Sequence, residues 1–78
     1  MKVIGFRKSQ FKGNDGDMVK GMNIFVTYPS EKGEGEECER LYLTEQRLSE
    51  IGYKPAVGDE IKPEYNRFGK VSGLELLG

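Results

Sequence analysis

The 78-residue chain contains no histidine and only one cysteine, Cys38. A single thiol cannot form an internal disulfide, and protein zinc sites depend mainly on histidine and cysteine. Without histidine the chain also lacks the commonest general base at neutral pH. The P-loop, G-x-S-x-G and H-E-x-x-H motifs are missing as well. We therefore expect a protein that is not an enzyme and that has no metal or other cofactor.

Long apolar runs are also lacking. No stretch approaches the ~18 apolar residues of a membrane-spanning helix, and residues 1–6 lack the apolar core of a secretory signal. We therefore expect a cytoplasmic protein with no membrane partner. At this length a single hydrophobic core is only just sufficient. We expect one domain over residues 1–78, with no room for a small-molecule substrate in an enclosed cleft.

Charge is nearly balanced over the whole chain, at a net of −1, but it is unevenly distributed. Residues 1–30 hold five cations and two anions, whereas residues 31–39 hold five anions and one lysine. Outside that acidic stretch the chain holds 11 cations and 8 anions, so the rest of the domain is mildly basic. This distribution favours a partner of negative charge. A surface of mixed charge that serves only solubility is the competing interpretation.

Turn residues and apolar alternation predict the first three strands. The chain is rich in glycine, with 11 residues, which suits short strands joined by turns. A strand from residue 2 leads to a hairpin loop at residues 13–17, and a second strand starts near Met18. Residues 22–28 alternate clearly and end at Pro29. A mobile acidic loop at residues 31–38 precedes a third strand at residues 39–43, with Leu41 and Leu43 directed inward.

A short helix is predicted at residues 45–51. Thr44 is a suitable N-cap and Gly52 a suitable residue to follow the last turn. Leu48 and Ile51 lie three residues apart, so both are expected to face the core. From the strands, Phe6 and Phe25 are also assigned to the core.

The last third of the chain predicts a hairpin of two curved strands. Asn66 and Gly69 mark its turn, because both tolerate positive φ. Val71 and Leu74 are three residues apart, where a flat strand would give two or four, so we expect a bulge at Ser72 and Gly73. The tip of this hairpin would present an aromatic ring and two cations to solvent.

The predicted order is strand, strand, strand, helix, strand, strand. This order makes the chain all-β with one short helix, and it is typical of a five-stranded OB-fold-like Greek-key barrel with the helix between strands 3 and 4. The bulged, curved strands of the last hairpin suit a small barrel. Another small barrel, such as an SH3-like one, is the leading alternative.

The sequence offers cations close to aromatic residues, the combination that binds single-stranded nucleic acid. The residues that we expect to contact nucleic acid are Arg67, Phe68, Lys70 and Tyr65 in the last hairpin, Arg7, Lys8 and Lys12 in the first strand, and Tyr28 and Tyr42. Phe68 could instead fold back over the barrel. Tyr28 and Tyr42 could instead be packing partners within the sheet.

Two segments of the chain resemble the C-terminal half of the gene V single-stranded DNA-binding proteins of filamentous phages. They are Lys54-Pro55-Ala56-Val57-Gly58-Asp59-Glu60-Ile61 and Arg67-Phe68-Gly69-Lys70-Val71, followed by a final strand that contains Leu76. The resemblance implies that Phe68 stacks on DNA bases and that Arg67 and Lys70 contact phosphates. It also implies an OB-fold, an origin in a phage or mobile element, and a homodimer that coats strands cooperatively. The acidic loop has no counterpart in that family.

The favoured function is therefore binding of single-stranded nucleic acid, DNA or RNA, with DNA preferred. The acidic loop could be a solvated surface, could repel DNA, or could mimic the charge of a nucleic acid. The last interpretation supports an alternative function. The chain would then be a small barrel that binds a protein, as an adaptor or inhibitor, without binding nucleic acid.

Overall fold

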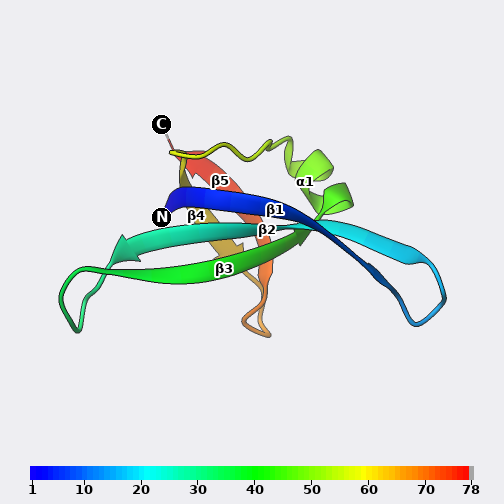
Figure 1. The fold of residues 1–78 in the computed structure, drawn as a ribbon, viewed down its shortest axis with the longest axis horizontal. Helices are drawn as coiled ribbons and strands as arrows, with labels where there is room; N and C mark the ends of the chain where they lie inside the picture. Colours follow the sequence, from blue (N-terminus) through cyan, green and yellow to red (C-terminus); the bar gives the residue numbers. More distant parts are fainter. Residues whose placement is uncertain (78) are drawn as a thin grey trace.

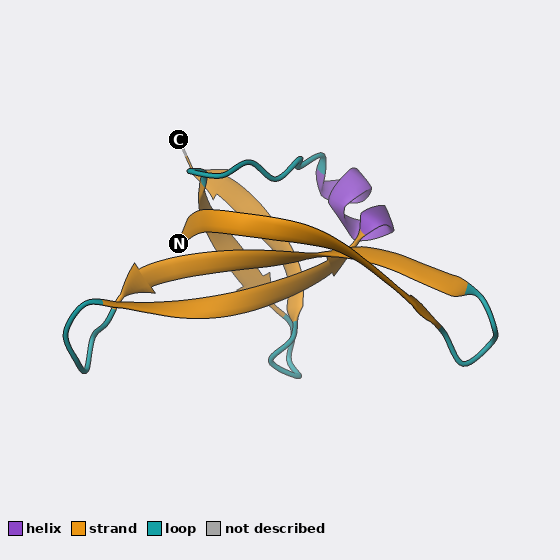
Figure 2. Cartoon of the chain, viewed as in Figure 1, coloured by secondary structure: helices purple, strands orange, loops and turns teal. Residues whose placement is uncertain are grey.

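The computed structural model describes residues 1–77, which form one antiparallel sheet of five strands and a short helix (Figures 1 and 2). The elements in chain order are β1 (Lys2–Lys12), β2 (Met18–Pro29), β3 (Glu36–Thr44), α1 (Glu45–Ile51), β4 (Glu60–Tyr65) and β5 (Val71–Leu77). The order across the sheet is β3, β2, β1, β4, β5. The predicted order of elements and the place of the helix are confirmed. Within the described residues 1–77, no helix is long and apolar enough to span a membrane.

The sheet is open rather than closed. Within residues 1–77, β3 pairs only with β2 and β5 pairs only with β4, so these two strands are its edges. β1 and β4 are joined over a short segment, where the Val3 N–H donates to the Asp59 carbonyl and the Ile61 N–H to the Met1 carbonyl, each at 2.8 Å. Beyond this junction β4 and β5 run across the sheet behind β1 and β2 (Figure 1), and β5 contacts β3.

The core is aliphatic and lies between β1–β3 and the β4–β5 hairpin. Its members are Val3, Ile24, Val26, Leu41, Leu43, Leu48, Ile61 and Leu74. Ile24 and Val26 alternate on β2 as predicted, and Ile24 lies opposite Leu41 on β3, where directly opposed residues share one face. Leu41 and Leu43 are directed inward, as predicted.

The helix has the predicted bounds and caps. The Thr44 side chain accepts a hydrogen bond from the Arg47 N–H at 3.1 Å, and Gly52 ends the helix in the left-handed region with φ of 77°. Leu48 is buried, as predicted. Ile51 is only half-buried and lies outside the buried core, because it is the last residue of a helix of seven.

Both phenylalanines that were predicted for the core lie outside it. Phe6 is 43% exposed: it faces the core side opposite Ile24, but α1 contacts no part of β1 and therefore leaves Phe6 uncovered. Phe25 is half-buried because it alternates with Ile24 and Val26 and so projects from the opposite, convex face of the sheet.

The acidic loop is shorter than predicted. β3 begins at Glu36, and its ladder to β2 continues as far as the pair of Pro29 with Glu36. The acidic start of β3 can join the ladder because its side chains remain exposed on an edge strand, where charged residues are tolerated. The loop at residues 13–17 agrees with the prediction: it is closed by the Gly13 N–H, which donates to the Asp17 carbonyl at 2.7 Å.

Candidate nucleic-acid interface

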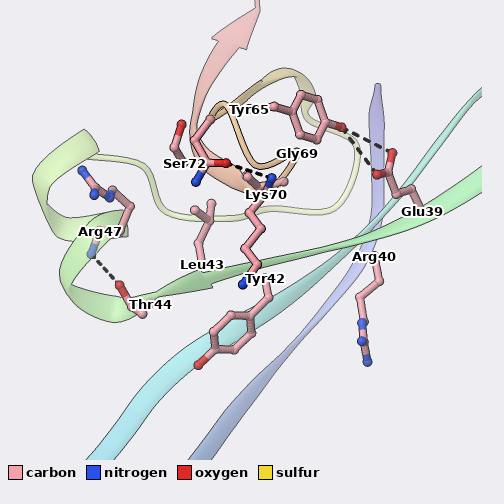
Figure 3. Close-up of a pocket in the computed structure, with 12 residues that line it drawn as sticks. Glu39, Arg40, Tyr42, Leu43, Thr44, Arg47, Tyr65, Gly69, Lys70 and Ser72 are labelled. Atoms are coloured by element: carbon pink, nitrogen blue, oxygen red, sulfur yellow. Dashed lines mark hydrogen bonds between the residues drawn. The ribbon is translucent and has the colours of Figure 1, made fainter.

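A groove lies between the free edges of β3 and β5 (Figure 3). We call it the β3–β5 groove. It has a volume of about 510 Å³ and receives residues from β3, from α1 and from the β4–β5 hairpin. Its charged and aromatic lining consists of Glu39, Arg40 and Tyr42 of β3, Arg47 of α1, Tyr65 of β4 and Lys70, which directly precedes β5. The groove therefore brings together residues that lie up to 33 positions apart in the chain.

Cations outnumber anions in the lining of the groove. Of its three cations, Arg47 forms an exposed ion pair with Glu50 at 3.2 Å, whereas Arg40 and Lys70 form no salt bridge within residues 1–77. Figure 3 shows the Lys70 side chain extending from the hairpin across the groove toward β3. Two cations without a carboxylate partner are therefore available to a negatively charged ligand.

The Asn66 side chain fixes the turn at the tip of the β4–β5 hairpin. The Asn66 carboxamide oxygen accepts hydrogen bonds from the N–H groups of Phe68 at 2.9 Å and Lys70 at 3.1 Å, and Gly69 adopts a φ of 78°. Asn66, also predicted as a tolerant turn residue, keeps a negative φ. As a result Phe68 is 73% exposed, and the Arg67 guanidinium lies over its ring at 5.0 Å from the centroid.

The predicted bulge follows that tip. Glu64 pairs with Gly73 and Tyr65 with Val71, which leaves Ser72 as the extra residue of β5. Arg67, Phe68 and Lys70 are all exposed, as predicted, and the Phe68 ring does not fold back over the sheet. Of the two cations, Lys70 extends over the groove.

Tyr42 connects the groove to the β1–β2 hairpin. Its ring lies 6.2 Å from the ring of Phe11, measured between centroids, with an angle of 45° between the planes. The ring passes over Gly21, where a Cβ atom would collide with the Tyr42 hydroxyl and ring. That hydroxyl is buried and has no hydrogen-bond partner within residues 1–77. Tyr42 is thus both a packing partner, as one interpretation expected, and part of the lining of the groove.

The basic cluster predicted in the first strand divides over two faces. Lys8 and Lys12 lie opposite Met22 and Met18. They are on the face of the sheet that packs against the core, but beyond the core itself. Arg7 and Phe11 lie on the other face, which they share with Tyr42, because successive residues of a strand point to opposite sides. Of Arg7, Lys8 and Lys12, only Arg7 therefore faces the same side as Tyr42, and Phe11 lies with it on that face.

Tyr65 lines the groove beside Glu39, whereas Tyr28 lies outside the groove, near Glu37 and Glu39. The Tyr65 hydroxyl donates to the Glu39 carboxylate, with its oxygen 3.4 and 3.5 Å from the two acceptors. Burial raises the pKa of Tyr65, and the Glu39 carboxylate and its hydrogen bond raise it further. Burial also raises the pKa of Tyr28, with Glu37 and Glu39 adding to the effect. Tyr65 therefore turns away from the cations of the tip, with which it was grouped, and toward a carboxylate.

Sequence patterns missed three charged residues of the groove, namely Glu39, Arg40 and Arg47. Glu39 was assigned to the acidic stretch. Arg40 lies two residues from Tyr42 but has no second cation beside it, and Arg47 has no aromatic residue within four positions. Only the approach of β5 to β3 places them together. Comparison with known proteins adds no assignment: no protein-family model, curated protein or solved structure matches the chain.

Proposed function

We propose that the chain binds single-stranded nucleic acid, with DNA preferred, along a path that runs from the hairpin tip through the β3–β5 groove to Tyr42 and Phe11. The observation that carries the proposal is the position of Tyr42. Its ring contacts Phe11 on one side and lines a groove that contains three cations on the other. Aromatic faces beside backbone-tracking cations are the combination that single strands require.

The proposal includes a finer description of the fold. The strand order, with β1 between β2 and β4 and with β3 approaching β5, fits an OB-fold-like Greek-key barrel whose seam between β3 and β5 is left open. In such barrels a loop between the last two strands helps to bind oligonucleotides. Here that loop carries Arg67, Phe68 and Lys70. The resemblance to gene V proteins rests on the same residues, and it extends the proposal to a homodimer from a phage or mobile element.

A fluorescence titration with oligo(dT) tests the proposal, and Phe68 provides its sharpest variant. Phe68→Ala should lose about 1–3 kcal/mol of affinity, the range for one stacked base, with the salt dependence nearly unchanged. Its melting temperature should hardly change, because the ring makes little contact with the fold. Val57→Ala is the matched control, since Val57 is 68% exposed on a different loop. Failure of the wild-type protein to bind any single strand at about 50 mM salt would contradict the proposal.

The alternative function, binding of a partner protein, is supported by a different observation. The convex face of the sheet carries a hollow of about 310 Å³ lined by Ile4, Phe25 and Cys38, with Glu39 and Arg40 at the edge strand. Ile4 is 50% exposed, because the register shift between Val3 and Gly5 makes it an extra residue on β1. An exposed apolar hollow with a charged border suits a protein partner. This function becomes the working hypothesis if single strands do not bind.

A further inference from the structure

The β3–β5 groove contains one carboxylate, Glu39, among its cations and tyrosines. Within residues 1–77 Glu39 forms no salt bridge, and the Tyr65 hydroxyl is the only side-chain donor that reaches it. Glu39 is half-buried, unlike the neighbouring acidic residues Glu36 and Glu37, which are exposed. The carboxylate therefore lines the groove without an ion-pair partner.

The Glu39 carboxylate keeps free capacity to accept hydrogen bonds. An ionised carboxylate offers about four acceptor positions on its two oxygens, and a tyrosine hydroxyl supplies a single proton. The distances from the Tyr65 hydroxyl, 3.4 and 3.5 Å, are long for a bond of this type. A ligand that carries donors can therefore bind beside Tyr65 without displacing it.

The phosphate and the base of a nucleotide suit different residues of this lining. A phosphate would be repelled by Glu39 and attracted by Lys70 and Arg40. A base that carries an exocyclic amino group presents the opposite requirement, because its N–H donors need an acceptor. Carboxylates accept such bonds from cytosine N4. The rings of Tyr42 and Tyr65, which line the same groove, provide aromatic surface for the base itself.

We propose that Glu39 selects the base in the β3–β5 groove, favouring cytosine, which offers an amino group at position 4, over uracil or thymine, which offer a carbonyl oxygen there. The inference rests on the proposed binding of single strands and adds a base preference to it. The competing explanation of the same carboxylate is repulsion alone: Glu39 would weaken the binding of every strand equally.

A comparison of oligo(dC) with oligo(dU), each of about 12 nucleotides, separates these explanations. The two bases differ in the groups at positions 3 and 4 and match in size, and mildly alkaline pH keeps the cytosine strand unprotonated. The wild-type protein should prefer oligo(dC) by about tenfold, the effect of one good contact between a side chain and a base edge. Glu39→Gln should abolish or reverse this preference, because an amide can donate to the uracil carbonyl.

Two control variants isolate the role of Glu39. Glu37→Gln makes the same change of charge on the same strand, at an exposed position outside the groove, and should keep the preference. Tyr65→Phe removes the donor that holds Glu39 and should also keep the preference, since the acceptor remains. A purely structural role for the contact between Tyr65 and Glu39 predicts that Tyr65→Phe and Glu39→Gln behave alike. Melting temperatures confirm that each variant is folded.

The possible results are distinct. Equal affinity of the wild-type protein for the two strands overturns the base preference while leaving single-strand binding intact. A Glu39→Gln variant that binds both strands more tightly, with the ratio between them unchanged, also overturns it in favour of repulsion. Absence of binding to both strands contradicts the proposed function itself. A preference for oligo(dC) that only Glu39→Gln removes supports the inference.

Discussion

The core and the β3–β5 groove meet at β3, where Leu43 belongs to both, and they are built in opposite ways. Leu41 and Leu43 of β3 enter a core of eight aliphatic residues, each at most 6% exposed. Tyr42, between them in sequence, leads instead to a groove of charged and aromatic residues. Because aliphatic burial dominates stability, the core should determine whether the chain folds. The groove should determine what the folded chain binds, and substitutions should separate the two.

The largest expected effect is on the core side of this comparison. Leu48→Ala should lower the free energy of unfolding by about 2–5 kcal/mol, because Leu48 is 6% exposed and its truncation leaves a cavity in the core. Urea denaturation measures this loss. Ser49→Ala, at an exposed position of the same helix, should change it by no more than about 0.5 kcal/mol. An unchanged melting temperature in Leu48→Ala would place Leu48 outside the core.

Gly21 of β2 lies beneath the Tyr42 ring. Gly21→Ala should force the Tyr42 ring off β2, because a Cβ atom there would collide with it, and should weaken strand binding as much as Tyr42→Ala, by about 1–3 kcal/mol. The loss of stability should be smaller than for Leu48→Ala, since the moving atoms are the far end of a side chain. Gly5→Ala is the control, because a Cβ at Gly5 meets nothing within 4 Å. Equal binding by Gly21→Ala and the wild type would remove Tyr42 from the interface.

Tyr53 packs against the core, and it should make the stability of the fold depend on pH. Burial raises the pKa of Tyr53 to about 12, and its hydrogen bond to the Asp59 carboxylate, 2.7 Å long, adds to the rise. A phenol whose folded pKa exceeds its unfolded value contributes stability that is fully present below the unfolded value of 10.0. This contribution is lost as the pH rises from there to about 12.

Tyr53→Phe should therefore be less stable than the wild type at neutral pH, by about 1 kcal/mol for the lost hydrogen bond. The difference in stability between the two proteins should shrink above pH 10.0. In that range the Tyr53 phenol ionises in the unfolded wild type but stays protonated in the folded state, which lowers the stability of the wild type alone. Urea midpoints at neutral and alkaline pH measure both effects. A constant difference in stability across this pH range would show that the pKa of Tyr53 is the same in the folded and unfolded states.

The smallest expected effect lies on the groove side and concerns salt. Lys70→Ala should flatten the slope of log affinity against log salt by about 0.7, the value for one phosphate contact on a single strand. Lys62→Ala removes the same charge from an exposed position on β4 outside the groove and should leave the slope unchanged. Equal slopes in all three proteins would mean that Lys70 contacts no phosphate.

The local features of this protein follow from residues that are close together in the chain. The helix between Thr44 and Gly52, the loop at residues 13–17 and the bulge at Ser72 appear where turn residues, caps and apolar spacing predicted them. Each depends on hydrogen bonds and backbone preferences within a few residues, which neighbouring residue types specify. The exposure of Phe68 at the hairpin tip belongs to the same group, because Asn66 and Gly69 shape that turn locally.

Tertiary structure decided which side chains meet. Only the coiling of the sheet brings β5 to β3, and so places Lys70 beside Glu39 and Tyr42 in one groove. The register of β1 against β2 places Arg7, rather than Lys8, on the face of Tyr42, and the lack of any contact between α1 and β1 leaves Phe6 exposed. The physical reason is that local preferences fix the direction of each strand, whereas strand pairing and helix docking depend on contacts between residues far apart in the chain.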